Sequence, residues 1–261
     1  MMCSKNSSRY EFDPPLSQGI IKERKNRFVA VVEIEKREVV CHCPVTGRIG
    51  DIVLKNIPCL LSASNDPHRK TPYTVKAIAL DDLDVADKNW IGIDLGLSNR
   101  IIEFFLQTHQ LGEMISDYSE VQREVRLGKS KLDFLVGNTY IEVKTPLNVL
   151  HVNYGKHIQT KATMPAFTST DRFMKHVCEL ANSLKTHERA ILVTVSQYRI
   201  THPRQWPKSP RAAEVADIVG KAIKRGVEFF EISMNFEPDG VSLVDCKSIT
   251  DSIEREIRKC S

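Results

Sequence analysis

The sequence predicts an α/β protein in two parts, a small β-barrel followed by a domain in which helices and strands alternate. Up to about residue 80, short apolar runs are separated by Gly, Pro, Asn and Asp, which is typical of the short strands of a small barrel. From about residue 98, segments with helical spacing alternate with strand-like runs. Residues 81–90, between the two parts, are acidic and have the composition of a connector.

Length and composition allow this division. The chain has 261 residues, 41% of them hydrophobic, which is enough for one large domain or two small ones. We expect a flexible tail at residues 1–11, the barrel domain at 12–85 and the α/β domain at 86–261. No apolar run approaches the length that crosses a bilayer, so we expect no membrane association.

The barrel strands follow from apolar and β-branched runs between turn residues such as Pro44, Gly47 and Gly50. We expect these strands at Gln18–Arg24, Arg27–Glu35, Glu38–His42, Asp51–Leu54, Ile57–Ser64 and Tyr73–Leu80.

The sequence Cys41-His42-Cys43 raises the question of a zinc site. A structural zinc ion needs four ligands, usually from paired cysteine units, and only scattered residues such as Cys59 and His68 would complete the set. On a strand, Cys41 and Cys43 face one way and His42 the other. We therefore interpret this segment as a buried strand end.

In the second part, a strongly apolar helix begins near Ser98, whose side chain has the chemistry of an N-cap. Helical spacing recurs at Asp171–Leu184 and at Ala212–Arg225, where Gly226 ends the pattern. The strands are expected at Ser119–Leu127, Ala190–Val195, Val227–Met234 and Val241–Val244, and residues 146–169 and 199–210 are expected to be loops.

The most informative segment is SKLDFLVGNTYIEVKT, residues 130–145. Its Gly137-Asn138 pair separates two runs of alternating apolar and polar residues, the pattern of a hairpin with a two-residue turn. That register places Asp133 opposite Glu142. Because successive side chains of a strand point to opposite faces, Asp133, Glu142 and Lys144 are expected on one face and the apolar residues on the other.

Two carboxylates that face each other across a ladder repel and cost stability unless something neutralises them. A divalent cation such as Mg²⁺ or Mn²⁺ does so, since these ions favour oxygen ligands. Lys144 would then lie beside the metal, where it orients a water or stabilises charge on a phosphate. Asp…Glu-x-Lys on a hairpin resembles the core signature of metal-dependent PD-(D/E)xK nucleases. The other interpretation is a solvated hairpin that carries two acids and a lysine.

The net charge and the cysteine content bear on the binding partner and on the cellular compartment of the protein. A net charge of +4 permits nucleic-acid binding without requiring it. The seven cysteines are scattered and odd in number, which is typical of a reducing, cytoplasmic or otherwise intracellular setting. Residues 1–15 lack the apolar core of a signal peptide, although their Ser and Lys/Arg content permits a short organellar targeting segment. The sequence leaves the oligomeric state open.

Several stretches, kept in order along most of the chain, resemble the sugar fermentation stimulation protein A (SfsA) family. They are Arg27-Phe28-Val29-Ala30, His42-Cys43-Pro44 with Thr46-Gly47, Arg69-Lys70, Asn99-Arg100, Glu124-Val125, Ser130–Phe134, Tyr140–Lys144, Thr170-Asp171-Arg172 with Lys175-His176, and Gly226-Val227-Glu228. The resemblance implies an N-terminal OB-like barrel and a C-terminal PD-(D/E)xK nuclease-like domain. It also implies DNA binding without strong sequence preference and a regulatory link to maltose fermentation.

Three positions depart from the family pattern. Val45 stands where the family usually has Asn, Ala166 lies where a Phe-Pro-Asp-Ala run is usual, and Phe173 replaces a Gly. The Asp/Glu/Lys set is intact. The departures affect loops that we expect to contact the substrate strand or the domain interface.

Three more groups are candidates beside the Asp/Glu/Lys set. Glu103 lies on the first helix, where such nucleases often carry an additional acidic ligand, although its neighbours are apolar and it would alternatively face solvent. Glu124, on the polar face of the preceding strand, either joins the site or pairs with Lys131. The Val143 carbonyl is the expected third metal ligand.

Basic residues are candidates for contacts with nucleic acid, because OB-type barrels use basic grooves to follow the backbone. A solvated basic face is an equally good interpretation. His176 would donate to a phosphate or, alternatively, pack against the sheet. The candidate set is Lys22, Arg24, Lys25, Arg27, Arg69, Lys70, Lys131, Lys175 and His176.

We favour a DNA-binding protein whose second domain hydrolyses phosphodiesters with Mg²⁺ or Mn²⁺, with DNA expected over RNA. Asp133 and Glu142 would hold the metal. Lys144 would position the attacking water and stabilise developing negative charge. The alternative is a non-catalytic, sequence-nonspecific DNA-binding regulator of sugar metabolism, because a fold does not fix a function.

Overall fold

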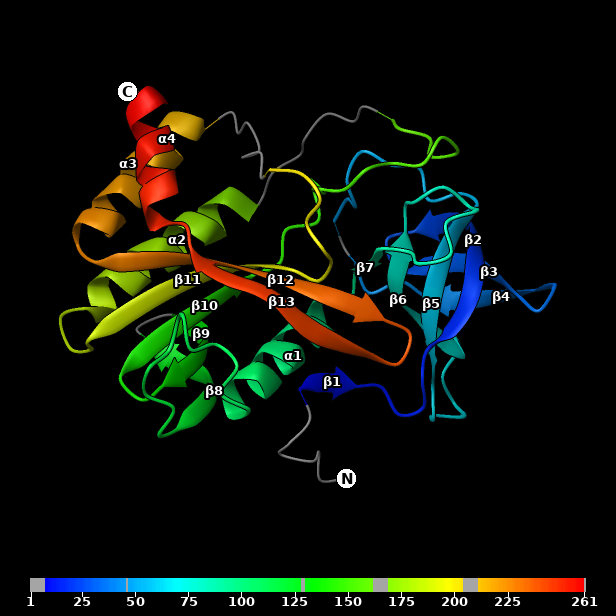
Figure 1. Cartoon of the computed structure of the whole chain (residues 1–261), viewed down its shortest axis with the longest axis horizontal. Coiled ribbons are helices and arrows are strands. Elements are labelled where there is room, and N and C mark those ends of the chain that lie inside the picture. The colour runs from blue at the N-terminus through cyan, green and yellow to red at the C-terminus, as the bar shows by residue number, and fades with distance from the viewer. Residues whose placement is uncertain (1–7, 46, 128–129, 162–168, 204–210, 261) are drawn as a thin grey trace.

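The computed structural model describes residues 8–45, 47–127, 130–161, 169–203 and 211–260. The expected fold class is confirmed: a β-barrel lies beside an α/β domain, and strand pairing continues from one into the other (Figure 1). None of the helices in the described part of the chain is long and apolar enough to cross a membrane.

Five strands form the barrel: β2 (Ser17–Asn26), β3 (Val29–Ile34), β4 (Arg37–His42), β5 (Ile57–Ala63) and β6 (Tyr73–Ala79). They pair antiparallel in the order β4-β3-β2-β5-β6, and a parallel pairing of His42 with Thr74 joins β4 to β6 and closes the barrel. A five-stranded barrel in this order is the OB arrangement. Its interior is filled by fully buried side chains such as Ile21, Ile57 and Ile78.

One expected barrel strand is wrong. Asp51–Leu54 forms no strand, and only Ile52 makes an isolated bridge, to Thr160. The backbone of this segment bonds to the loop around Gln159 and Lys161 and not to a barrel strand, so it has no ladder to join.

The segment Cys41-His42-Cys43 is a buried strand end, as expected. Cys41, Cys43 and Cys59 are buried in the barrel core, and His42 is half-buried on the other side of its strand. Burial raises the pKa of the Cys41 thiol to about 11, which disfavours the thiolate that a zinc ion requires. Within the described residues no three His, Cys, Asp or Glu side chains form a metal-binding group.

The second domain is built on a mixed sheet that is joined to the barrel through β7 (Trp90–Gly92), a strand that pairs with β6 and with β12. Its parallel centre consists of β10 (Thr139–Lys144), β11 (Arg189–Ser196) and β12 (Val227–Glu237). The antiparallel neighbours are β8 (Val121–Leu127), β9 (Ser130–Val136) and β13 (Gly240–Ser248).

Helices cover both faces of this sheet (Figure 1). On one face, α1 (Leu95–Gln107) buries Ile101 and Phe105 against Ile141 and Val193 of the sheet. On the other face lie α2 (Ser169–Ser183), α3 (Ala212–Lys224) and α4 (Thr250–Cys260), whose apolar residues pack on the opposite side of the same strands. The hairpin β9–β10 therefore lies between two helical layers.

The structure corrects two predictions, the residue at which the first helix begins and the residue at which the N-terminal tail ends. Helix α1 begins at Leu95 and its N-cap is Asp94, whose side chain accepts a hydrogen bond from the Gly96 N–H; Ser98 is a buried residue inside the helix. The end of the expected flexible tail is a strand, β1 (Arg9–Glu11), which pairs with β13; residues 1–7 lie outside the described part of the chain.

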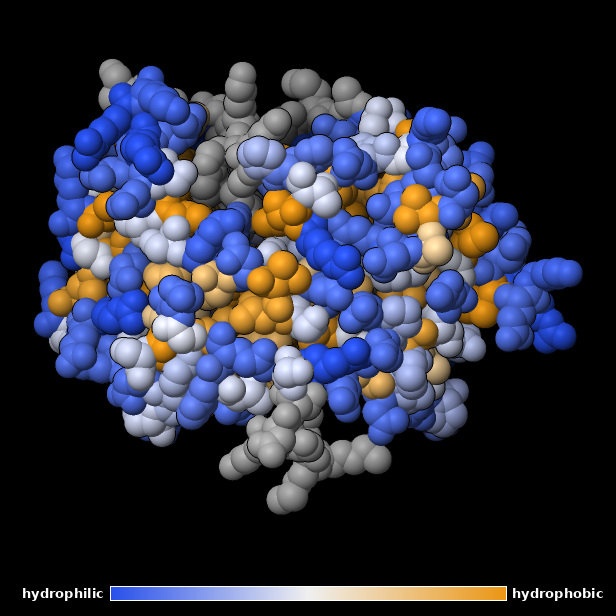
Figure 2. Space-filling view, in the orientation of Figure 1, coloured by the Kyte–Doolittle hydropathy of each residue, from blue (hydrophilic) through white to orange (hydrophobic). Residues whose placement is uncertain are grey.

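The face of the molecule in Figure 2 is mostly hydrophilic. Apolar side chains gather near its centre, over the region where Figure 1 draws β12 and β13. Val244 of β13 is the most prominent exposed apolar side chain of that strand, with 53% of its surface accessible.

Candidate active site

The hairpin of residues 130–145 has the expected register. Gly137 has a φ of +52°, which a glycine adopts without strain, and the chain reverses over Gly137 and Asn138. The antiparallel pairs are Val136 with Thr139, Leu135 with Tyr140, and Phe134 with Ile141.

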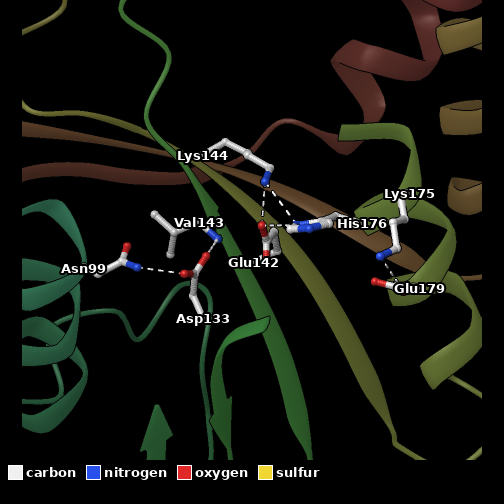
Figure 3. Close-up of polar contacts among 8 residues, drawn as sticks. All are labelled: Asn99, Asp133, Glu142, Val143, Lys144, Lys175, His176 and Glu179. Carbon is white, nitrogen blue, oxygen red and sulfur yellow. Dashed lines mark hydrogen bonds and ion pairs between the residues drawn. The ribbon is translucent and has the colours of Figure 1, made fainter. Parts of the chain in front are cut away.

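The two strands part just beyond the Phe134–Ile141 pair, and Asp133 lies at that opening (Figure 3). Its Oδ2 accepts a hydrogen bond of 2.8 Å from the backbone N–H of Val143, and its Oδ1 accepts one of 2.7 Å from Nδ2 of Asn99 on α1. Asp133 therefore turns toward the gap between β9 and β10, whereas we expected it on the same face as Glu142. The physical reason is that the Val143 N–H has left the ladder and needs an acceptor.

Glu142 and Lys144 lie on the face of the sheet that α2 covers (Figure 3). Lys144 Nζ donates to Glu142 Oε1 over 2.5 Å, and His176 Nδ1 of α2 contacts the same oxygen. Lys144 Nζ lies 3.2 Å from His176 Nδ1, so the three side chains form one connected cluster. The Glu142 side chain is only 3% exposed, and its second oxygen, Oε2, is buried without a hydrogen-bond partner in the described structure.

The two carboxylates have opposite pKa shifts. Burial raises the pKa of Asp133, and the nearby charge of Glu142 raises it further, against the opposing hydrogen bonds from Val143 and Asn99. Burial on its own would also raise the pKa of Glu142, but the hydrogen bond from His176 and the charge of Lys144 outweigh it and lower that pKa below its ordinary value. Glu142 is therefore the more strongly ionised of the two.

This donor set fits a small divalent cation. A buried carboxylate oxygen without a donor, beside a second carboxylate, is the arrangement that such an ion would satisfy. Asp133 and Glu142 would be the two carboxylate ligands.

Glu103 is not in contact with this cluster in the described structure. It lies one helical turn beyond Asn99, and its Oε2 accepts a 2.9 Å bond from Arg123 of β8. Glu124 is likewise engaged, in a 2.5 Å ion pair with Lys131, so of its two expected roles the pairing is the one observed. Asn99 is the α1 residue that reaches Asp133; it belongs to a stretch that resembles the family, but its residue type gave no signal of this role.

The nine basic candidates do not form one surface. Lys22, Arg24 and Lys25 lie on β2 of the barrel, whereas Lys131 lies on β9 and Lys175 on α2, which Figure 1 draws on the other side of the molecule. His176 is 5% exposed and packs against the sheet, so it follows the second of its two expected roles.

Arg24 has a structural role in the barrel. Its guanidinium donates to the carbonyl oxygens of Asn26, Arg27, Val45 and Gly47. Lys22 is paired with Glu33 at 3.3 Å, and Lys25 lies 4.0 Å from Glu23. Lys175 lies 3.9 Å from Glu179 on its own helix, and Arg27, Arg69 and Lys70 are exposed.

The family departures that fall on described residues are apolar packing positions. Val45 is 1% exposed inside the barrel core, and Phe173 of α2 packs against the apolar cluster under that helix. Neither side chain is a loop contact of the kind expected. Ala166 lies outside the described residues.

The fold and the site together define a class of protein: an OB barrel followed by a restriction endonuclease-like domain whose central hairpin carries Asp, Glu and Lys. Two family models match in that order. The SfsA N-terminal OB domain matches residues 23–93, and the sugar fermentation stimulation protein RE domain matches residues 96–240. The chain belongs to the sugar fermentation stimulation protein (SfsA) family.

Similar proteins support this assignment. A sugar fermentation stimulation protein homolog of Synechococcus sp. (strain JA-2-3B'a(2-13)) is 30% identical over 246 residues, which cover 92% of this chain and 96% of that protein. The homolog of Synechococcus sp. (strain JA-3-3Ab) is 32% identical over 237 residues, or 89% of this chain and 92% of that protein. A structure of Pyrococcus furiosus SfsA in complex with Ca²⁺ shares the fold, with a TM-score of 0.69 and 21% identity over 92% of this chain and 98% of that one.

Proposed function

We propose that this protein binds nucleic acid and hydrolyses its phosphodiester bonds with a divalent cation, Mg²⁺ or Mn²⁺, and that DNA is its substrate. The observation that carries the proposal is a half-buried carboxylate, Asp133, near a buried one, Glu142, which keeps one oxygen without a donor. A buried acid in that state costs free energy unless a cation or a proton satisfies it.

Asp133 and Glu142 would hold the cation, with the Val143 carbonyl as a third ligand. In a strand, the N–H and C=O of one residue point toward the same neighbouring strand. Since the Val143 N–H points at Asp133, we expect its carbonyl to face the same opening. The Ca²⁺ complex of the Pyrococcus furiosus protein supports a divalent cation on this fold.

A divalent cation supplies polarisation of the phosphate and a lower pKa for water beside it. The other steps belong to side chains of this chain. Lys144 stabilises the negative charge that develops on the phosphate and orients the attacking water. His176 and Lys144 both bond to Glu142 Oε1, which fixes that carboxylate and leaves Oε2 directed elsewhere. Asn99 and the Val143 N–H hold Asp133 in the same way.

Of the predicted basic residues, we propose the exposed ones as contacts for the nucleic-acid backbone. Arg27, Arg69 and Lys70 on the barrel are exposed, and Lys175 is half-exposed in the middle of α2, next to His176 in the sequence. The Arg24 guanidinium donates to backbone carbonyl oxygens, so we do not count it among the nucleic-acid contacts. Because phosphate contacts release counterions, affinity should fall steeply as salt rises.

The test is a cleavage assay on single- and double-stranded DNA and on RNA of the same sequence. We expect hydrolysis with Mg²⁺ or Mn²⁺, loss of hydrolysis when the cation is removed with EDTA, and recovery when it is restored. DNA should be cleaved in preference to RNA. If the protein binds DNA and takes up the cation but hydrolyses no form of either polymer, the enzyme proposal fails.

A non-catalytic DNA-binding regulator of sugar metabolism is the second candidate, and one observation favours it. Lys144 forms an ion pair with Glu142 and His176 bonds to the same oxygen, so this carboxylate already has two protein partners without a cation. This candidate predicts salt-sensitive DNA binding that neither EDTA nor Lys144→Ala changes.

A further inference from the structure

Helix α1 contacts the hairpin at two places, Asp133 of β9 and Thr145, the residue that follows β10. Ser98 Oγ lies 2.9 Å from Thr145 Oγ1, directly after the end of β10, and Asn99 Nδ2 donates to Asp133 Oδ1 of β9 over 2.7 Å. The two contacts come from consecutive residues, and Ser98 is fully buried. The helix therefore bonds to Asp133 at the opening and to the chain just beyond the end of β10.

We propose that Asn99 is a positioning residue that holds the Asp133 carboxylate in the opening of the hairpin, where it bonds the Val143 N–H within range of the Glu142 charge. The part of this proposal that concerns a cation rests on the function proposed above. The part that concerns the hydrogen bond to Val143 does not.

Asn99 suits this task because its helix is anchored at its start. The N-cap Asp94 accepts from the Gly96 N–H at 3.0 Å through Oδ1, and from Lys76 Nζ of the barrel at 2.5 Å through Oδ2. Gln197, at the end of β11, donates to the Asp94 carbonyl over 3.3 Å. A side chain on a fixed helix holds its partner more exactly than one on a loop does.

The geometry also explains why a donor is needed at position 99. Asp133 stands next to the charge of Glu142, and without its two donors the repulsion would turn the carboxylate away. Charge-assisted hydrogen bonds of 2.7 and 2.8 Å are strong enough to oppose that repulsion. Glu103 cannot take over, because it is an acceptor and Arg123 binds it.

The first test needs no metal. In Asn99→Leu, which has a similar size but no donor, the Asp133 carboxylate should move and release the Val143 N–H. We expect amide hydrogen exchange at Val143, measured by NMR in EDTA, to become at least about ten-fold faster relative to the β11 amides. The matched control, Glu103→Gln on the same helix, should leave Val143 exchange unchanged.

Unchanged Val143 exchange in Asn99→Leu overturns the proposal. If that variant does not fold, Asn99→Ala is measured by the same comparison with β11, and an unchanged Val143 amide there overturns it equally. Faster exchange at Val143 and β11 alike indicates general loosening and also counts against a positioning role.

The second test measures Mn²⁺ affinity by calorimetry. Loss of a residue that orients a metal ligand typically costs about 10–100-fold in affinity, and we expect a loss in this range for Asn99→Leu and none for Glu103→Gln. Equal affinity of Asn99→Leu and the unmodified protein overturns the link between Asn99 and the cation. If the unmodified protein binds no Mn²⁺, the proposed cation chemistry fails, and the Val143 exchange still decides the positioning role.

Discussion

Lys144 Nζ lies 2.5 Å from Glu142 Oε1, two residues earlier on the same strand, and 3.2 Å from His176 Nδ1 on α2. The lysine is 26% exposed, whereas the glutamate side chain is 3% exposed. One partner of this ion pair therefore reaches the solvent from which a substrate arrives, and the other is fixed beneath it. This difference in exposure separates their expected roles in charge stabilisation and metal binding.

Lys144→Ala should abolish cleavage and leave Mn²⁺ binding largely intact, because lysine is not a metal ligand. Loss of one charge-stabilising donor typically costs about 10²–10³-fold in rate, and a loss of at least that size is expected. Cleavage rates and calorimetric Mn²⁺ titrations measure the two effects. Lys221→Ala, an exposed lysine of α3 paired with Asp217, is the matched control. A Lys144→Ala protein that cleaves normally, or that loses Mn²⁺ binding, contradicts this role.

Asp133→Asn should weaken cation binding and cleavage together, and it should also change how stability depends on pH. Because the pKa of Asp133 is raised in the folded protein, the folded state binds more protons than the unfolded state above the ordinary aspartate pKa. The stability contribution of Asp133 is therefore lost as pH rises through its folded pKa. In EDTA, the free energy of unfolding of Asp133→Asn minus that of the unmodified protein should therefore be larger at about pH 7 than at about pH 3. Urea unfolding at both pH values measures it, and a constant difference would count against the raised pKa.

Glu142→Gln should show the opposite trend. The folded pKa of Glu142 is lowered, so its contribution is present above the ordinary glutamate pKa and is lost as pH falls through the folded value. At neutral pH the substitution removes the negative charge that strengthens the bonds of Glu142 Oε1 with Lys144 and His176, and should cost about 1–3 kcal/mol. The same urea series tests it, and a variant that is most destabilised in acid would refute the assignment.

Substitutions of Arg24 and Arg27 should have different effects, the first on stability and the second on DNA binding. Arg24→Ala leaves several backbone carbonyls without their donor and should lower the free energy of unfolding by about 1–3 kcal/mol. Arg27→Ala, an exposed position, should leave stability unchanged, weaken DNA binding and reduce its salt slope by about 1. Urea unfolding and DNA titrations at several salt concentrations measure both. Binding that does not respond to salt would remove nucleic acid as the partner.

Asp94→Ala should destabilise the protein through two losses. It removes the N-cap of α1 and leaves Lys76, which is 15% exposed, without its carboxylate partner. The expected cost is about 2–4 kcal/mol. Asp94→Asn combined with Lys76→Met keeps a capping side chain without a buried charge and should recover much of the loss. The exposed Asp217→Ala is the control, expected within about 0.5 kcal/mol of the unmodified protein.

Local sequence was enough for most secondary structure. The hairpin register follows from Gly137-Asn138 and from alternation within a few residues, and Ala190–Val195 is central to β11 because its apolar run is long enough to be buried on both faces. The elements that were missed have little local signal. Strand β7 has three residues and exists because β6 and β12 pair with it. Helix α4 is strongly charged, and few apolar residues such as Ile253 mark its buried side.

The sequence by itself determined a small barrel followed by an α/β domain and pointed to Asp133, Glu142 and Lys144 as site candidates, because turn chemistry and strand periodicity act over short distances; the OB type of the barrel came from the family resemblance. Only the tertiary structure decided that Asn99, 34 residues before Asp133, reaches it and that His176, 34 residues after Glu142, joins that carboxylate. It also decided that Arg123 binds Glu103. These contacts depend on how α1 and α2 pack on opposite faces of the sheet, and the free energy of that packing is spread over many apolar side chains that no short motif records.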